Sequence, residues 1–118
     1  ACVFLPEFCE GDNSKITIKH LLTMSSGLDW DEDYHDPLGQ TAEAYFAPNL
    51  KEQMMRLKAV ETPGEIFKYH SSCSQLLAFI VESATGKSVN EYTSEKLWKP
   101  MGAKHAALWN TDTKRGDE

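Results

Sequence analysis

The chain has 118 residues, of which 41% are hydrophobic and 25% charged, fractions that exclude a disordered tail or a collagen-like fibre. Its length is enough for one hydrophobic core. The formal net charge is −6 and the 12 basic residues are scattered, which argues against a nucleic-acid partner. The longest apolar run, residues 76–81, is much shorter than the roughly 20 residues of a membrane-spanning helix, so no span is expected.

The cysteines and histidines do not predict a metal site. Cys2, Cys9 and Cys73 form no pair at two-residue spacing, and an odd count argues against a closed disulfide framework, so we expect free or buried thiols. No second ligand at helical spacing accompanies any histidine. The four histidines are His20, His35, His70 and His105. Neither a metal nor a cofactor is therefore predicted.

The first quarter of the chain predicts an irregular surface segment followed by a short helix. Residues 2–14 contain a Pro, a Gly and an Asp-Asn pair, which are typical of loops. Thr17 is a suitable N-cap for a helix whose apolar positions lie within residues 18–25. Gly27 is placed to end this helix in a left-handed conformation.

The second quarter predicts a long loop and a second helix. Residues 29–48 have no sustained period, apart from one helical turn expected near residues 41–46. Asn49 followed by Glu52 resembles a capping pair, and apolar residues repeat on one helical face through residues 50–57. We therefore expect a helix there.

The strongest helix follows a very short expected strand at residues 67–69. Ser72 and Gln75 have the spacing of a capping box. Apolar residues cover a wide face over residues 73–84, and Gly86 is suited to end the helix. Such a wide apolar face predicts that the helix is buried.

The last quarter predicts one more capped helix and a frayed tail. Ser88 and Glu91 form a second capping box, followed by an apolar face over residues 89–97. A short strand is expected at residues 106–109, and residues 110–118 are polar and expected to fray. The chain is thus predicted to be mainly α, with at most short strands.

Three segments carry a family resemblance in the same order along the chain. They are FLPEF (4–8), ITIKHLLTMSSGLDW (16–30) and PGEIFKYHSSCSQLLAFIVESATGKSVNEYTSEKLWKPMGA (63–103). Together they resemble the serine β-lactamase-related family, which includes class C β-lactamases, penicillin-binding DD-peptidases, esterases and 6-aminohexanoate-dimer hydrolases. The resemblance implies an α/β sheet domain with a helical insertion, of which residues 1–118 are a single fragment. It also implies a periplasmic or secreted protein.

Catalysis in this family uses a Ser with a Lys one helical turn later, a Tyr-x-Asn or Tyr-x-Ser motif, and a Lys-Thr-Gly-like strand. Only the middle motif occurs here, as Tyr69-His70-Ser71. The resemblance implies that Tyr69 is the catalytic acid and base and that Ser71 is a supporting hydrogen-bonding group, while His70 has no family role. Ser71 departs from the Asn of the β-lactamase version, which favours the peptidase, esterase and amide-hydrolase branches.

The ordinary pKa of a phenol is consistent with a role for Tyr69 that depends on a neighbouring lysine. A phenol ionises near pH ~10 in water, so a tyrosine base at neutral pH needs cations beside it. The family's Lys would supply that charge, but no Ser in the chain is followed by Lys three residues later. The oxyanion-stabilising strand is also absent from the sequence, so we expect these residues alone to be inactive. The expected partners are a small-molecule or peptide amide or ester substrate of the parent protein and the missing sheet domain.

Alternatives exist for each feature. Tyr69 is also suited to packing on Phe67, and Ser71 to capping a helix. The acidic and aromatic residues 30–36 lack the Gly and Glu of a calcium loop, which favours a solvated loop over a cation site. A separate hypothesis is that this loop borders the substrate cleft in the whole enzyme. For the parent protein, the alternatives are a non-catalytic peptidoglycan- or peptide-binding relative and a helical interaction domain.

Large apolar residues near the end of the chain predict an interdomain surface. The spacing of Trp98, Met101 and Trp109 is typical of core or interdomain packing rather than of a ligand-binding cluster. They are expected to pack on the missing sheet domain, and to promote self-association when it is absent.

Overall fold

The computed structural model describes residues 1–46, 48–108 and 111. Within these residues the chain is mainly helical, which confirms the predicted fold class, and the only β-pairing is an isolated antiparallel bridge between Leu28 and Ala59. The elements in chain order are η1 (Pro6–Cys9), η2 (Gly11–Lys15), α1 (Ile18–Leu22), α2 (Gln40–Phe46), α3 (Leu50–Met55), α4 (Ser71–Thr85), α5 (Val89–Thr93) and η3 (Ser94–Trp98).

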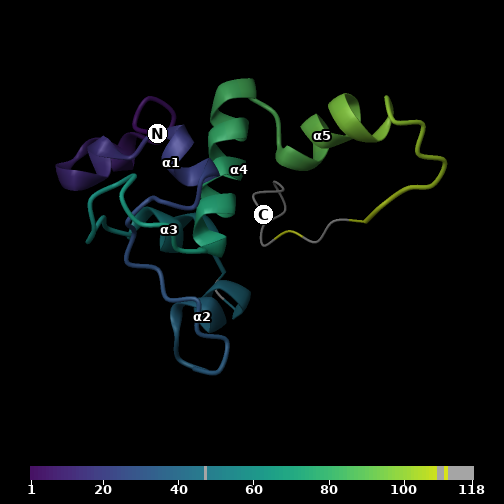
Figure 1. The fold of residues 1–118 in the computed structure, drawn as a ribbon. Coiled ribbons are helices and arrows are strands. Elements are labelled where there is room, and N and C mark those ends of the chain that lie inside the picture. Colours follow the sequence, from purple (N-terminus) through teal and green to yellow (C-terminus); the bar gives the residue numbers. More distant parts are fainter. Residues whose placement is uncertain (47, 109–110, 112–118) are drawn as a thin grey trace.

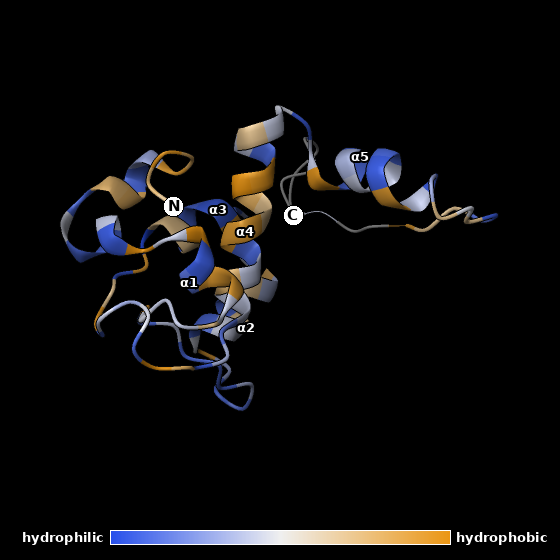
Figure 2. Ribbon diagram, turned by 45° about the horizontal axis from the view of Figure 1, so that its top comes forward, coloured by the Kyte–Doolittle hydropathy of each residue, from blue (hydrophilic) through white to orange (hydrophobic). Residues whose placement is uncertain are grey.

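Helix α4 is the centre of the fold. It packs against α1, α3 and α5 (Figure 1). Its residues Cys73, Leu76 and Ile80 follow helical spacing and are buried, as the apolar face predicts. Figure 2 shows this concentration of apolar residues along α4. The core that they join is completed by Leu5, Phe8, Ile16, Leu21, Leu28, Trp30, Met54, Leu57 and Phe79.

The N-terminal segment is part of the core, so the prediction of an irregular surface segment is wrong. It forms the two 3-10 helices η1 and η2, and both Leu5 and Phe8 are buried. Cys2 and Cys9 form a disulfide, with their Cα atoms 4.8 Å apart, because η1 folds the chain back on itself. The prediction of free thiols is therefore wrong for this pair and correct for Cys73, which is buried and free.

Asn13 joins this N-terminal segment to the chain that follows α3. Its side-chain amide donates to the carbonyl oxygen of Leu57 over 2.8 Å and accepts from the backbone N–H of Ala59 over 2.7 Å. The side chain is buried, so it satisfies two backbone groups that would otherwise lack partners.

The prediction that Gly27 ends α1 is wrong. The helix ends at Leu22, and Met24, with φ 52°, is the first left-handed residue after it. Gly27 also has a positive φ of 72°, but a Cβ atom there would lie 2.3 Å from the carbonyl oxygen of Glu61. Its role is therefore to allow two distant backbone segments to approach closely.

The expected strand at residues 67–69 is absent. Lys68 makes one backbone hydrogen bond, from its N–H to the carbonyl oxygen of Met24 over 2.8 Å. A ladder requires a repeated pattern of such bonds between the same two segments, and this pair supplies only one. No strand forms at residues 106–108 either, and Trp109 lies outside the described residues. The predicted fraying of residues 110–118 falls outside them too, except for Thr111.

The helix caps agree with the sequence at every helix where one was predicted except α4. Side chains of Thr17, Asn49 and Ser88 cap α1, α3 and α5, respectively. Gly86 ends α4 with φ 68°, as expected. The predicted capping box of Ser72 and Gln75 is wrong, because the N-cap of α4 is His70 and the buried Ser72 hydroxyl has no hydrogen-bond partner within residues 1–46, 48–108 and 111.

After α4 the chain leaves the core as an extended arm, residues 89–108, which begins with α5 and η3 (Figure 1). η3 is π-helical, and its Trp98 indole donates to the carbonyl oxygen of His105 over 2.9 Å. Leu97, Met101 and Leu108 are exposed on this arm, so large apolar side chains are uncovered there. Among the described residues, no helix is long and apolar enough to cross a membrane.

Candidate functional site

Tyr69 lies just before the N-terminus of α4, two residues ahead of the first helical residue. Tyr69 is 56% exposed, and the nearby Phe67 is exposed as well. Tyr69 is therefore not a core residue, and its phenol does not depend on burial for its place in the fold. The phenol is open to a reactant or to another domain.

Ser71 is the first residue of α4 and is bound by Glu32 from the long loop. The Ser71 backbone N–H donates to Oε2 of Glu32 over 2.7 Å. The N-terminus of a helix has free N–H groups and a partial positive charge, and an anion satisfies both. Glu32 thus takes the capping role that the sequence had assigned to serines.

The same carboxylate holds the loop together. The Trp30 indole Nε1 donates to Oε2 of Glu32 over 2.7 Å, and the Tyr34 hydroxyl donates to Oε1. Burial raises the pKa of Glu32, but the hydrogen bonds from Tyr34, Ser71 and Trp30 outweigh this effect and leave the pKa below its usual value. The bond to Glu32 raises the pKa of Tyr34 to about 12, with smaller contributions that include the nearby phenols of Tyr69 and Tyr45.

His70, between the two candidate residues, points into the protein. Its side chain is only 1% exposed, and neither ring nitrogen has a hydrogen-bond partner among the described residues. Burial lowers the pKa of His70, and nearby Lys68 lowers it further. The imidazole is therefore neutral near pH 7 and belongs to the inner side of the segment, opposite the exposed phenol.

The acidic loop is anchored and not merely solvated. Asp31, Asp33 and Asp36 each accept a hydrogen bond from the backbone N–H two residues later, which shapes the turns of the loop. Trp30 is 2% exposed and lies in the core. In the part of the chain that the structure describes, no group of three His, Cys, Asp or Glu side chains is arranged to hold a metal ion.

Sequence reasoning missed Glu32. The signal was present as Trp30-x-Glu32-x-Tyr34, because alternate residues of an extended segment share a face. What the pattern could not indicate was the partner, since Ser71 lies 39 residues away in the chain.

A small cavity of about 210 Å³ opens beside Ser71, between the loop and α2. It is lined by Trp30, Tyr34, Thr41, Ala44, Tyr45, Leu50 and Ser71.

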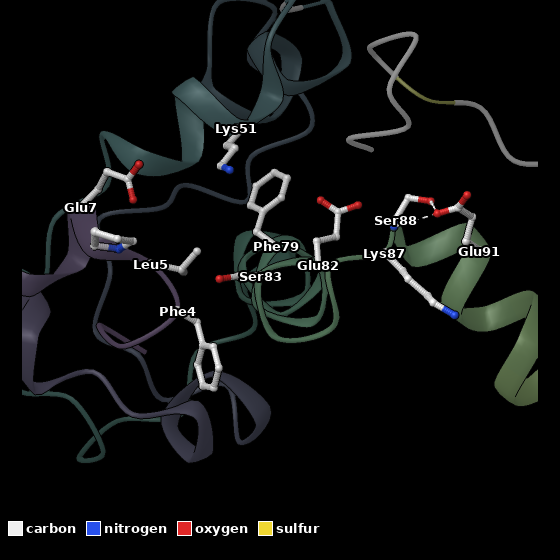
Figure 3. A pocket seen from close by; sticks show the side chains of 12 residues that line it. Phe4, Leu5, Glu7, Lys51, Phe79, Glu82, Ser83, Lys87, Ser88 and Glu91 are labelled. Atoms are coloured by element: carbon white, nitrogen blue, oxygen red, sulfur yellow. Dashed lines mark hydrogen bonds between the residues drawn. The ribbon is translucent and has the colours of Figure 1, made fainter.

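A larger cavity of about 600 Å³ lies elsewhere, between the N-terminal segment, α4 and the start of α5. Figure 3 shows it, with Phe4 and Glu7 on one side and Glu91 on the other. The ammonium group of Lys51 lies 5.8 Å from the centre of the Phe79 ring there. Because neither Tyr69 nor Ser71 lines it, this cavity is not part of the candidate site.

Comparison with known proteins assigns the chain to a class. The family described as Beta-lactamase matches residues 2–116, nearly the whole chain. The chain therefore belongs to the Beta-lactamase family, within the serine β-lactamase-related group that its motifs predicted.

Individual relatives are similar at low identity. The chain is 30% identical over 104 residues to Protein flp of Staphylococcus aureus strain MW2, covering 88% of this chain and 20% of that protein. It is 29% identical over 114 residues to a putative D-alanyl-D-alanine carboxypeptidase of Escherichia coli K12, covering 89% and 26%. It is 25% identical over 108 residues to the putative penicillin-binding protein PbpX of Bacillus subtilis strain 168, covering 92% and 25%. The chain thus spans about a fifth to a quarter of these relatives.

Proposed function

We propose that the complete protein is a serine hydrolase that cleaves amide or ester bonds through an acyl-serine intermediate. Membership of the Beta-lactamase family supports this proposal, as do similar proteins named penicillin-binding protein and carboxypeptidase. The observation that carries it is the position of Tyr69, whose phenol is exposed immediately before a buried helix. A neighbouring domain could bring a serine and a lysine to that phenol.

In the proposed reaction, Tyr69 moves protons. The nucleophilic serine attacks the carbonyl carbon, and its proton passes through Tyr69 to the leaving amine or alcohol as the bond to the leaving group breaks. Water then attacks the acyl-serine ester, and its proton returns through the same phenol to the serine. Ser71 is proposed to support Tyr69 at the edge of this site, where Glu32 already holds its backbone.

We further propose that the nucleophile, its lysine and the oxyanion-side strand come from outside these 118 residues, which are therefore inactive alone. The exposed apolar side chains of Leu97, Met101 and Leu108 support the docking of another domain on the arm. The Cys2–Cys9 disulfide supports a periplasmic or secreted location, because disulfides persist in oxidising compartments.

The test uses the complete protein and a fluorescent penicillin or phosphonate probe, which labels a reactive serine. Labelling is expected for the wild type and should fall by roughly 10²–10⁴-fold in rate for Tyr69→Phe. Tyr92→Phe on α5 is the matched control and should label normally. Absence of labelling in the wild type, together with peptide binding, would favour the non-catalytic alternative. Unchanged labelling of Tyr69→Phe would remove Tyr69 from the mechanism.

A further inference from the structure

We propose that the cavity beside Ser71 is a substrate subsite for a neutral, ring-sized apolar group. That the bound group is part of a substrate rests on the proposed hydrolase function. The cavity shares Ser71 with the candidate site and is bounded by the loop residue Tyr34, whose hydroxyl binds Glu32. A group bound there would therefore be attached to a substrate whose scissile bond lies near Tyr69.

The walls of the cavity are mostly apolar because three of its polar side-chain groups already have partners. The Trp30 indole N–H and the Tyr34 hydroxyl both donate to Glu32. The Thr41 hydroxyl donates to the carbonyl oxygen of Asp33. These bonds leave ring faces and methyl groups to line the cavity, together with Ala44 and Leu50. A pocket of fixed apolar walls binds apolar groups by removing them from water.

The size and charge of the cavity define the occupant. Its volume of about 210 Å³ suits one six-membered ring, since cavities of roughly 150 Å³ can hold benzene. None of its lining residues is charged, and the anionic Glu32 is hydrogen-bonded to three of them, Trp30, Tyr34 and Ser71. A carboxylate on the ring would be repelled, so the subsite should select neutral rings.

Two series of ester substrates, assayed with the complete protein, test this inference. In the first series the substituent on the acyl group changes from methyl to phenyl. In the second series the substituent on the leaving group changes in the same way. In at least one series, the phenyl member should exceed the methyl member in kcat/KM by roughly tenfold to hundredfold, and a carboxyphenyl member should lose this gain. Ala44→Leu fills the cavity and should bring the phenyl member down to the methyl rate. Ala84→Leu, exposed on α4 away from the cavity, should preserve the preference.

A binding measurement makes the test independent of turnover. In fluorine NMR, 4-fluorobenzamide should bind the wild type more tightly than 4-fluorobenzoate, by at least tenfold. Binding should be lost in Ala44→Leu and weakened in Tyr45→Ala, which removes an exposed wall with little effect on folding. Ring binding without any ester turnover would retain the subsite and overturn the hydrolase function. Turnover without ring preference, or ring binding unaffected by both substitutions, would overturn the subsite.

Discussion

The carboxylate of Glu32 accepts the backbone N–H of Ser71 over 2.7 Å, across 39 residues of sequence. This bond fastens the acidic loop to the N-terminus of α4, beside the exposed phenol of Tyr69. One carboxylate therefore caps the central helix and, through Trp30 and Tyr34, shapes the adjacent cavity. Stability and the geometry of the candidate site depend on the same side chain.

Replacing Glu32 by Gln should lower the free energy of unfolding by roughly 1–2 kcal/mol at pH 7, because the amide keeps one acceptor and turns a donor toward groups that also donate. Since the folded-state pKa of Glu32 is lowered, its contribution is present above the unfolded pKa and is lost as the pH falls through the folded value. Urea unfolding at pH 7 and at pH 3 should show the difference shrinking. The control Glu65→Gln, at an exposed position, should change the free energy of unfolding little at either pH. An equal loss of stability in Glu32→Gln at both pH values would contradict the prediction.

Replacing His70 by Phe should remove part of the acid sensitivity of the protein. Because burial lowers the folded-state pKa of His70, the unfolded state binds the proton first, and stability falls as the pH drops below the ordinary value for histidine. One such group contributes at most about 1.4 kcal/mol per pH unit. Thermal or urea unfolding between pH 7.5 and pH 5 should show that the free energy of unfolding depends less steeply on pH in His70→Phe than in the wild type. The exposed control His35→Phe should keep the wild-type slope, and identical slopes for all three proteins would refute the assignment.

Alanine at Gly27 should cost about 3 kcal/mol, because it combines a left-handed backbone with a clash against the carbonyl of Glu61. Gly86 also has a positive φ, but a Cβ atom there meets nothing within 4 Å. Gly86→Ala should therefore cost only about 1 kcal/mol. Denaturant midpoints of the two variants measure this difference directly. Equal losses would show that close approach to Glu61 does not constrain Gly27.

Thiol counting should identify one free cysteine per chain. Cys73 is buried, and burial raises the pKa of its thiol, so Ellman's reagent should react slowly with the folded protein. Unfolding without reductant should expose one thiol, and reduction should raise the count to three because the Cys2–Cys9 disulfide opens. Cys73→Ser should give none before reduction. Three thiols in the unreduced, unfolded wild type would disprove the disulfide.

The sequence by itself determined the helices and most of their ends. Thr17, Asn49, Ser88 and Gly86 act within one turn of their helices, and the apolar face of α4 repeats at helical spacing. Such signals connect residues at most four positions apart, so they can be read before any tertiary contact is known. The motifs that led to the family are likewise continuous in the chain.

Only the tertiary structure decided which distant residues meet. It placed Leu5 and Phe8 in the core and brought Glu32, rather than Ser72, to the N-terminus of α4. It also brought Gly27 against Glu61, a contact that no local pattern announces. The physical reason is that these contacts depend on how the helices pack against one another, because a side chain can satisfy a distant backbone group only after packing has brought the two together.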